Sequence, residues 1–478
     1  MQPSDTTIGL SRLAPDRQTF NLARLRLAPG PIAGRLALGT QIAVAFVVVM
    51  FTSARESAVV PQSSKTYPNW MAGPLHGAFG GLTNKTSTMN LIFTLALLVT
   101  LVAYVVAVAS APKLSMRTIW IAAGALVTIM LLGPPLLLTD IFNYLGYARL
   151  GVVHHLNPYT HVIGAISHDP VYVLSTWRNL HSPYGELFTA FTYTFSWLPL
   201  PVAFWILKVL TVLAALAFLW LVSLCARRLG RDPRFAVALI AFNPLFVIYA
   251  IGGFHNDFFM LVAVTGAIAL LLSRRDRSAG AALMLAVGIK YTAILLLPFM
   301  LLAVPTNSRR LRILQGAVLA AIPLIVGSLL LFGFSVANIS DQARILTNFS
   351  VPQVVGLLVG LGGATHWLLD LADALVVVTV VYLLWRRREW LSAAGWATLA
   401  LIASLSWLMP WYVLWALPLA ALATSAPLRR ATYAMTLFLV LTFVPNLWVY
   451  MEHHHISPLR SPTGRASVAL VKRLEHNP

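Results

Sequence analysis

Long apolar runs, separated by short polar or basic segments, make up the chain from residue 36 to residue 450. An α-helix needs about 20 predominantly apolar residues to cross the hydrocarbon core of a bilayer. The pattern therefore predicts an all-α polytopic membrane protein with about 11–13 transmembrane helices. The expected spans are 36–52, 90–111, 119–138, 203–225, 235–251, 258–273, 312–334, 367–385, 391–408, 411–426 and 431–450.

One apolar stretch, 279–304, does not fit a straight span, because three arginines lie just before it (274–277) and three just after it (309–312). Basic residues of membrane proteins stay on the cytoplasmic side. A straight span would put one of these clusters outside. The stretch is therefore predicted to be a re-entrant hairpin of two short helices that enters and leaves on one side, with Lys290 at its apex near the middle of the bilayer.

The polar segments divide the chain into one membrane domain with two polar ends. The first apolar run has no small-residue cleavage site after it, which favours an anchor over a removed signal peptide. An apolar, aromatic segment at 185–198 is too short to span and is expected to lie along the membrane interface. The expected organisation is a flexible basic cytoplasmic N-terminus at 1–34, a membrane domain at 35–450 with external loops at 53–89, 139–201 and 335–366, and a polar tail at 451–478.

The composition agrees with this class of protein. Hydrophobic residues make up 58% of the chain and charged residues only 10%, with a mean hydropathy of +0.78. The net charge of +19 could suggest nucleic-acid binding, but the basic residues form short clusters between apolar runs, which is the positive-inside pattern. One segment does not agree with this pattern: by the count of spans, the basic tail at 451–478 falls outside. The single Cys225 excludes a disulfide framework.

Polar chemistry is concentrated in the loop that follows the 119–138 run, where Asp140 comes first. An acid at the end of an apolar run is costly unless it is paired or used, and an acid held at such a boundary suits general-base work on a sugar hydroxyl. The alternative is a helix N-cap, because the residues that follow Asp140 have a helical pattern. The two roles are compatible with each other.

The same loop supplies further candidate substrate-binding residues. A helix after Asp140 places Tyr144 on the side that faces a cleft, and the Leu-Asn-Pro-Tyr turn that contains Asn157 and Tyr159 ends it. His154 and His155 could donate hydrogen bonds to a phosphate or act only as interfacial side chains. The histidines do not have the spacing of a metal site.

A second polar group, His255, Asn256 and Asp257, follows two glycines at the outer end of the 235–251 run. These residues could form an ordinary turn between two helices. Three hydrogen-bonding side chains on the same side as Asp140 are more than a turn requires, which favours a substrate site.

Two cations and two aromatic residues complete the candidates. Lys290 is either a snorkelling lysine or a buried cation for a lipid phosphate, and Arg344 in the third external loop is a second candidate cation. Trp411 and Tyr412 lie in an aromatic segment that could be an interfacial belt or a platform for a sugar ring or a polyprenyl chain.

Taken in order, five segments of the chain resemble the GT-C membrane glycosyltransferases. They are TDIFNYLGYARLGVVHHLNPY from Thr139, SPYGELF from Ser182, NPLFVIYAIGGFHNDFFM from Asn243, GIKYTAILLLP from Gly288 and LSWLMPWYVLW from Leu405. Within that group the chain resembles the actinobacterial polyprenol-phosphomannose-dependent α-1,6-mannosyltransferases. The resemblance covers most of residues 119–425.

The resemblance implies a GT-C fold with its active site on the extracytoplasmic face of the bacterial plasma membrane. It implies transfer of a sugar, with mannose expected, from a polyprenyl-phosphate donor to a glycan or glycolipid acceptor, with inversion. Asp140 would be the general base, and Asn256 and Asp257 would orient the substrate or hold the first external loop in place. The cations expected at the leaving phosphate are His255, Lys290 and Arg344.

The chain departs from the GT-C pattern at one position. Many of these enzymes have a second acid two residues after the first, whereas this chain has Phe142. The chemistry is therefore expected to need no metal or other cofactor. The alternative function is a multi-span lipid or sugar transporter or flippase, which a mid-membrane Lys290 would also suit. A transporter would place its polar groups at the midplane on inverted repeats, and this chain gathers them at one face. A weaker third possibility is a scaffold subunit of a cell-envelope complex.

Overall fold

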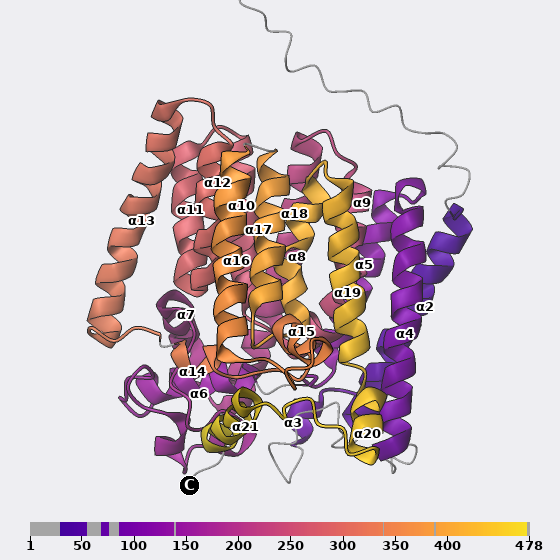
Figure 1. Cartoon of the computed structure of the whole chain (residues 1–478), viewed down its shortest axis with the longest axis vertical. Helices are drawn as coiled ribbons and strands as arrows, with labels where there is room; N and C mark the ends of the chain where they lie inside the picture. The colour runs from indigo at the N-terminus through magenta and orange to yellow at the C-terminus, as the bar shows by residue number, and fades with distance from the viewer. Residues whose placement is uncertain are drawn as a thin grey trace, which may run out of the picture.

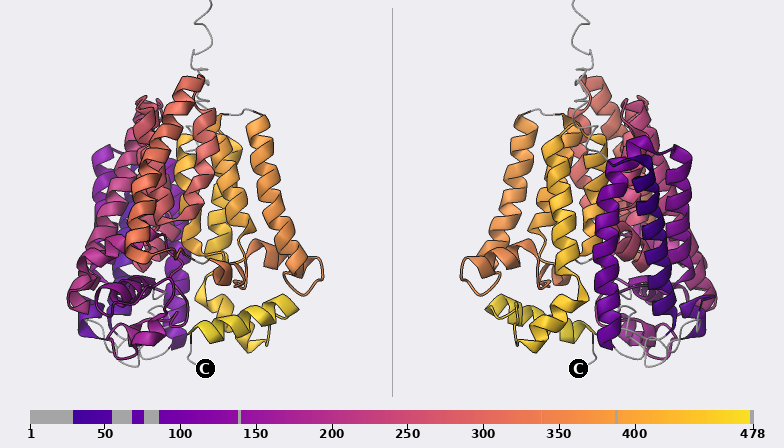
Figure 2. Two further views of the ribbon diagram at one scale, coloured as in Figure 1. Left: turned by 90° about the vertical axis from the view of Figure 1, so that its left-hand side faces the viewer. Right: turned by 90° about the vertical axis from the view of Figure 1, so that its right-hand side faces the viewer.

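The computed structural model describes residues 29–54, 68–75, 86–137, 140–337, 339–386 and 389–475, and all regular elements in these ranges are helices (Figure 1). A bundle of roughly upright helices forms the larger part of the molecule. A layer of short helices and loops lies at one end of the bundle, below it in both side views (Figure 2). We call this the outer layer, because the sequence predicts the extracytoplasmic loops there.

Five helices in the described ranges are long and apolar enough to cross a membrane. Two bent pairs, with angles of 54° and 50°, raise this number to seven if each pair is one span. The bends fall at Pro244 and Pro445, where proline lacks the N–H that would continue the helical ladder. The long helices are α2 (Pro31–Ala54), α4 (Thr86–Ser110), α8 (Leu200–Arg228), α13 (Asn307–Phe332) and α16 (His366–Trp385); the bent pairs are α9 (Pro233–Ala241) with the π-helical η4 (Leu245–Ile251), and α19 (Ala426–Thr442) with α20 (Pro445–His453).

Shorter apolar segments fill the bundle between these helices. They are α5 (Met116–Leu132), α10 (Asp257–Leu272), η5 with α12 (Tyr291–Leu302), α17 (Trp390–Ser404) and η6 with α18 (Pro410–Leu422). The predicted all-α polytopic class is confirmed, but the expected 11–13 helices are reached only when these shorter segments are counted. Individual spans also differ from the prediction. The 119–138 run stops being helical at Leu132, and the 235–251 and 431–450 runs are bent rather than straight.

The predicted hairpin is seen in the way its two ends meet. Helix α11 (Asp276–Ile289) runs toward the outer layer, and η5 with α12 returns (Figure 1). Asp276 at the start of α11 lies 2.7 Å from a guanidinium nitrogen of Arg309 and 3.2 Å from one of Arg312, at the start of α13. Both ends of the 279–304 stretch therefore lie on one side, and Lys290 occupies the turn between α11 and η5.

The outer layer contains α6 (Asp140–Val152), α7 (Glu186–Ser196), α14 (Ser340–Ala343), α15 (Val351–Leu358) and α21 (Pro462–Glu475). Helix α7 corresponds to the short helix expected at 185–198. Arg149 of α6 binds Asp169 at 2.9 Å and the carbonyls of Ser196 and Leu198 at 3.1 and 3.2 Å, which ties the loop to the end of α7. Of the predicted 53–89 loop, the region around α3 (Asn69–Ala72) is described, and most of the rest lies outside the described residues, as do residues 1–28.

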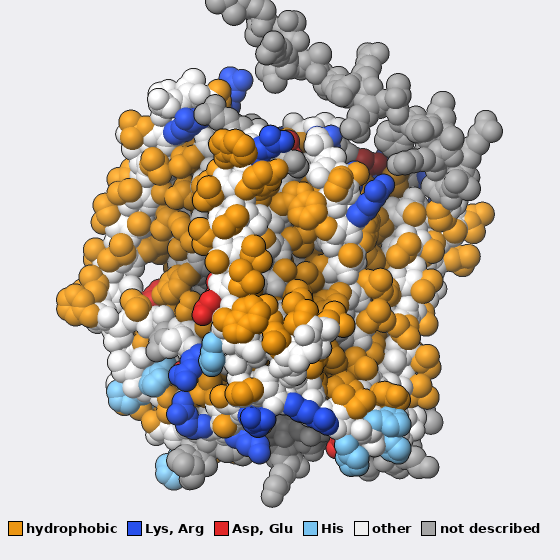
Figure 3. All heavy atoms as spheres, in the orientation of Figure 1, with side chains coloured by type: hydrophobic (Ala, Val, Ile, Leu, Met, Phe, Trp, Pro, Cys, Tyr) orange, Lys and Arg blue, Asp and Glu red, His pale blue; other side chains and the backbone are white. Residues whose placement is uncertain are grey.

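The polar tail folds back as a helix of the outer layer. The amide of Asn179 donates to the carbonyl of Leu474 at 2.9 Å, and Leu474 packs in one apolar cluster with Trp177 and Leu180. The tail therefore lies on the same side as the 139–201 loop, as the count of spans implies. Lys and Arg side chains gather at the upper end of the bundle and in a second band across the outer layer, where α21 lies (Figure 3).

Candidate active site

The site is built where the end of α5 meets the turn after η4. Gly133 to Pro135 end α5, and the amide of Leu136 then donates to the carbonyl of Gly252 at 2.7 Å. This contact brings the segment that leads into Asp140 beside the segment that carries His255. A Cβ on Gly253 would collide with the His255 ring, so only glycine fits there.

Asp140, His255 and Trp411 form the centre of the site. One carboxylate oxygen of Asp140 lies 3.1 Å from Nδ1 of His255, and their side chains are 13% and 1% exposed. The two atoms are close enough for an ion pair, but the angles between them do not suit a hydrogen bond. Nδ1 of His255 therefore has no hydrogen-bond partner within the described residues. The Trp411 indole also restricts the imidazole ring of His255: the two rings stack with centroids 3.5 Å apart and an interplanar angle of 14°. His255 is thus held between the Trp411 ring and the Asp140 carboxylate.

Asn256 and Tyr144 connect this centre to α6. The Tyr144 hydroxyl donates to Oδ1 of Asn256 at 3.4 Å and accepts from its backbone amide at 3.2 Å. Burial, aided by the nearby carboxylates of Asp140 and Asp257, raises the pKa of the Tyr144 hydroxyl well above its ordinary value, so the hydroxyl stays protonated. Nδ2 of Asn256 is buried and has no partner within the described residues, which leaves a donor for a ligand.

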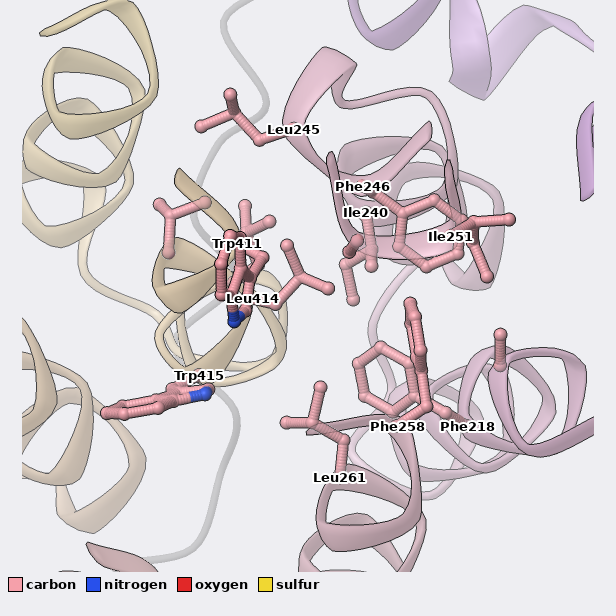
Figure 4. Packing of buried hydrophobic residues seen from close by; sticks show 14 of the residues in the cluster. Phe218, Ile240, Leu245, Phe246, Ile251, Phe258, Leu261, Trp411, Leu414 and Trp415 are labelled. Carbon is pink, nitrogen blue, oxygen red and sulfur yellow. The ribbon is translucent and has the colours of Figure 1, made fainter. Parts of the chain in front are cut away.

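Asp257 holds the cation of the site. Its Oδ1 accepts from Nζ of Lys290 at 2.8 Å and from the indole N–H of Trp415 at 2.6 Å. The ammonium also lies 4.9 Å from the ring centroid of Tyr412 and 4.8 Å from that of Trp415. Figure 4 shows Trp411 and Leu414 of η6 beside the buried side chains of η4 and α10, with the Trp415 ring at the edge of the same cluster. Lys290 is therefore not a snorkelling side chain but half of an ion pair.

These residues surround a cavity of about 200 Å³ at the boundary between bundle and outer layer. Asp140, Tyr144, Asn256, Asp257, Lys290, Trp411 and Tyr412 line it, so seven of the thirteen predicted site residues share one space. His255 lies directly behind Asp140. The outer wall is formed by Trp177 and Leu180 from the 139–201 loop and by Gln342 and Ile345 from the 335–366 loop.

Five predicted residues lie away from the cavity. His154 binds Asp169 at 2.7 Å and helps to hold the outer loop, and His155 is exposed. Asn157 donates to the carbonyl of Phe332 at 2.7 Å, and the Tyr159 hydroxyl bonds Thr189 and the carbonyl of Tyr184, so both have structural contacts. Arg344 is exposed beside Ala343 and Ile345, which line the cavity while Arg344 does not.

The sequence interpretation missed several contributors to the site. Trp415 was in the aromatic segment but was not selected, although it follows Trp411 by one helical turn. Tyr184 packs edge-on against Tyr144 at 4.7 Å and lines the cavity. Tyr184 stands next to Gly185 and Glu186 in a segment that the resemblance had quoted, and this signal could have found it. No such local signal marked Lys208, described below.

Within the part of the chain that the structure describes, no group of three or more His, Cys, Asp or Glu side chains is arranged to hold a metal ion. Phe142, at the position of the missing second acid, is fully buried and stacks on Phe204 with an interplanar angle of 5°. The expectation that no metal is needed stays a prediction.

Fold and site together define an all-helical polytopic membrane protein with an acidic and aromatic cavity at one end of its bundle. Residues 39–306 match the family model described as alpha-(1->6)-mannopyranosyltransferase, N-terminal domain, and residues 347–452 match the MptB C-terminal domain. The chain belongs to the α-(1→6)-mannopyranosyltransferase family, which confirms the resemblance found in the motifs.

Three curated relatives show how similar the chain is in sequence to other proteins of this kind. Alpha-(1->6)-mannopyranosyltransferase A of Mycobacterium tuberculosis is 28% identical over 356 residues, which cover 66% of each chain. A probable alpha-(1->6)-mannopyranosyltransferase of Mycolicibacterium smegmatis is 25% identical over 369 residues, 64% of this chain and 66% of the relative. Alpha-(1->6)-mannopyranosyltransferase A of Corynebacterium glutamicum is 28% identical over 182 residues, so that the match spans 36% of that relative. No solved structure matches the chain.

Proposed function

We propose that the protein is a mannosyltransferase that moves mannose from a polyprenyl-phosphate donor to an extracytoplasmic glycan or glycolipid acceptor, with Asp140 as general base. Membership of the family and the names of the relatives support mannosyl transfer. The observation that carries the role of Asp140 is its position: its carboxylate opens into the cavity while it lies 3.1 Å from the buried His255.

In the proposed reaction, the Asp140 carboxylate takes the proton of an acceptor hydroxyl as the hydroxyl oxygen attacks the anomeric carbon of mannose. The bond between that carbon and the phosphate oxygen breaks, and its electron pair leaves with polyprenyl phosphate. A single displacement inverts the anomeric configuration. Phosphate is a weakly basic leaving group, so stabilisation by positive charge and N–H donors matters more than protonation.

Two groups that line the cavity are available for that stabilisation. Lys290 presents an ammonium to the cavity and is held in place by Asp257, and the unpartnered Nδ2 of Asn256 points to a hydrogen bond with a donor oxygen. His255 lies behind Asp140 and orients it. Arg344 stays a candidate for the rim of the cavity, because its two neighbours line that rim.

An apolar groove beside the cavity supports a lipid-linked donor. It has a volume of about 450 Å³ and runs between α7, α11 and α13. Tyr291 lines both the groove and the cavity, and its hydroxyl donates to Glu186 at 2.5 Å where the two spaces adjoin. Only 17% of the most apolar stretch of α13 is buried inside the protein, so the groove opens toward the surrounding lipid. A donor with its phosphate in the cavity and its chain in the groove fits this arrangement.

The experiment measures transfer from radiolabelled polyprenyl-phosphate mannose in membranes that contain wild type, Asp140→Asn or Asp341→Asn. Loss of a general base lowers the rate by about 10²–10⁴-fold, so Asp140→Asn should be nearly inactive. Asp341→Asn removes a carboxylate of the same outer layer that does not line the cavity, and should transfer at the wild-type rate. Excess EDTA should leave the wild-type rate unchanged.

The possible contrary results separate the parts of the proposal. Transfer that survives Asp140→Asn would mean that another acid is the base, with Asp257 the next to test. Wild-type membranes that transfer nothing from this donor would overturn the choice of mannose or of the lipid carrier, and other polyprenyl-phosphate sugars would follow. Loss of transfer in EDTA would overturn the metal-independent chemistry.

A further inference from the structure

A lysine is fully buried in the middle of the long helix α8 and takes no part in the reaction proposed above. Lys208 is among the largest side chains with no exposed surface. Its Nζ lies 4.0 Å from the Trp205 ring centroid, 4.6 Å from that of Phe254 and 5.2 Å from that of Phe204. It donates one hydrogen bond, of 2.5 Å, to the carbonyl of Gly133. Within the described residues, no carboxylate forms an ion pair with it.

A buried ammonium without a counter-ion is an expensive way to fill such a space. Aromatic faces attract a cation, but they do not replace its full hydration, and a leucine or methionine would pack there with no charge to desolvate. An ionisable residue inside a membrane-spanning helix is for this reason a candidate for a functional role. What Lys208 contacts indicates which role.

Lys208 contacts both of the backbone segments that lead to Asp140 and His255. Gly133 is the residue at which α5 ends and the segment toward Asp140 begins, and Phe254 immediately precedes His255. The segments touch elsewhere through the hydrogen bond from Leu136 to Gly252.

Both segments contain a non-glycine residue with positive φ, Leu137 at 71° and Phe254 at 54°. L-residues adopt this conformation only when their surroundings hold them in it. Lys208 donates a hydrogen bond to the Gly133 carbonyl and packs on the Phe254 ring. These two contacts help to hold both segments in their conformations.

We propose that Lys208 is a positioning residue for the mannosyl transfer proposed above: the hydrogen bond from its Nζ to Gly133, with its packing on the Phe254 ring, holds the end of α5 against the Phe254 turn and so sets Asp140 against His255. It touches neither substrate nor the reacting atoms. Its effect passes through the alignment of the pair, whose side chains lie 3.1 Å apart. The inference rests on the proposed role of Asp140.

The test compares kcat and the donor KM for Lys208→Met and Lys208→Gln. Methionine keeps the apolar length and removes the N–H donor, whereas glutamine keeps an N–H donor. Misplacing a catalytic group by about 1 Å costs on the order of 10²-fold in rate. Lys208→Met should therefore lose about 10- to 100-fold in kcat with KM within about twofold, and Lys208→Gln should recover part of that loss. Thr211→Val is the matched control, because Thr211 is buried on the same helix and its hydroxyl donates to the carbonyl of Leu207 in that helix.

A double-mutant cycle with His255→Gln distinguishes positioning from a merely structural role. If Lys208 acts through His255, then Lys208→Met should cost much less in the His255→Gln background than in wild type. Equal losses in the two backgrounds, a wild-type kcat in Lys208→Met, or no advantage of Gln over Met would each overturn the inference. The result is separate from that of the proposed function, since a dead Asp140→Asn with an unimpaired Lys208→Met would leave the function standing and remove this role.

Discussion

At the scale of single residues, the site depends on pairs that are remote in sequence. Asp257 is buried and Lys290 is 21% exposed, and their ion pair has the indole N–H of Trp415 as a second donor to the same oxygen. Such a pair contributes little net stability, yet removing one member leaves an uncompensated charge. Asp257 is therefore best understood as the residue that holds the Lys290 side chain in place at the cavity.

Lys290→Met should raise the donor KM, because the phosphate loses its cation, and should also lower the melting temperature by stranding Asp257. For a buried pair the stability cost of breaking one partner is about 3–5 kcal/mol, and the partial exposure of Lys290 puts this pair at or below the lower end. The double variant Lys290→Met with Asp257→Asn should regain melting temperature but not donor binding. Thermal unfolding in detergent and donor kinetics measure the two effects. A Lys290→Met protein with unchanged KM would show that the phosphate binds elsewhere.

At the scale of elements, one small network organises the outer layer. Asp169 accepts hydrogen bonds from Arg149 and from the backbone of Val171 and lies 2.7 Å from Nε2 of His154. Burial acts to raise the pKa of Asp169, but these partners outweigh it and hold the pKa below its ordinary value of 3.8. The loop between α6 and α7, which forms one wall of the cavity, is thereby fastened to the ends of both helices.

The sign of this shift sets the pH at which the loop should loosen. A carboxyl with a lowered pKa in the folded state stabilises the fold above its unfolded pKa, and this stability is lost as pH falls through the folded pKa. The amides of residues 153–182 should therefore be well protected from hydrogen exchange at neutral pH, relative to an unfolded chain at the same pH, and should lose this protection below about pH 4. Asp169→Asn should exchange faster at neutral pH and should lack that transition. A wild-type loop that stays equally protected down to pH 2 would contradict the assignment.

At the scale of the whole molecule, the outer layer and the upper end of the bundle are the two ends that would lie on opposite sides of the membrane. The three arginines of 274–277 and the three of 309–312 gather at the end away from the cavity, at the two ends of the hairpin. By the positive-inside rule we expect the cavity, and α21 with it, to lie outside the cytoplasm. This orientation belongs to the proposed function.

Cysteine labelling tests the orientation cleanly, because the only native cysteine, Cys225, is buried and can be replaced by alanine. In that background Arg465→Cys, on the exposed side of α21, should react with a membrane-impermeant maleimide in intact cells. Ser308→Cys, exposed in the first turn of α13, should react only after permeabilisation. The reverse pattern would place the cavity on the cytoplasmic face, and labelling of both in intact cells would contradict the path of the chain through the bundle.

The sequence by itself determined the properties that depend on local pattern. Apolar length marked the membrane helices, the arginines around 279–304 marked the hairpin, and short motifs marked Asp140, the 255–257 group, Lys290 and the Trp411 segment. These properties are legible because hydropathy and charge act on each segment separately, whatever lies beside it.

Only the tertiary structure decided which of these side chains meet. His154 and His255 were both candidates in the sequence, yet His154 binds Asp169 while His255 stacks on Trp411 behind Asp140. Lys208 lies in an unremarkable apolar run, and its importance appears only where α8 crosses the end of α5 and the Phe254 turn. Such contacts depend on how helices bend and cross, as α9 and η4 do at Pro244, and these angles follow from packing across the whole bundle rather than from any one segment.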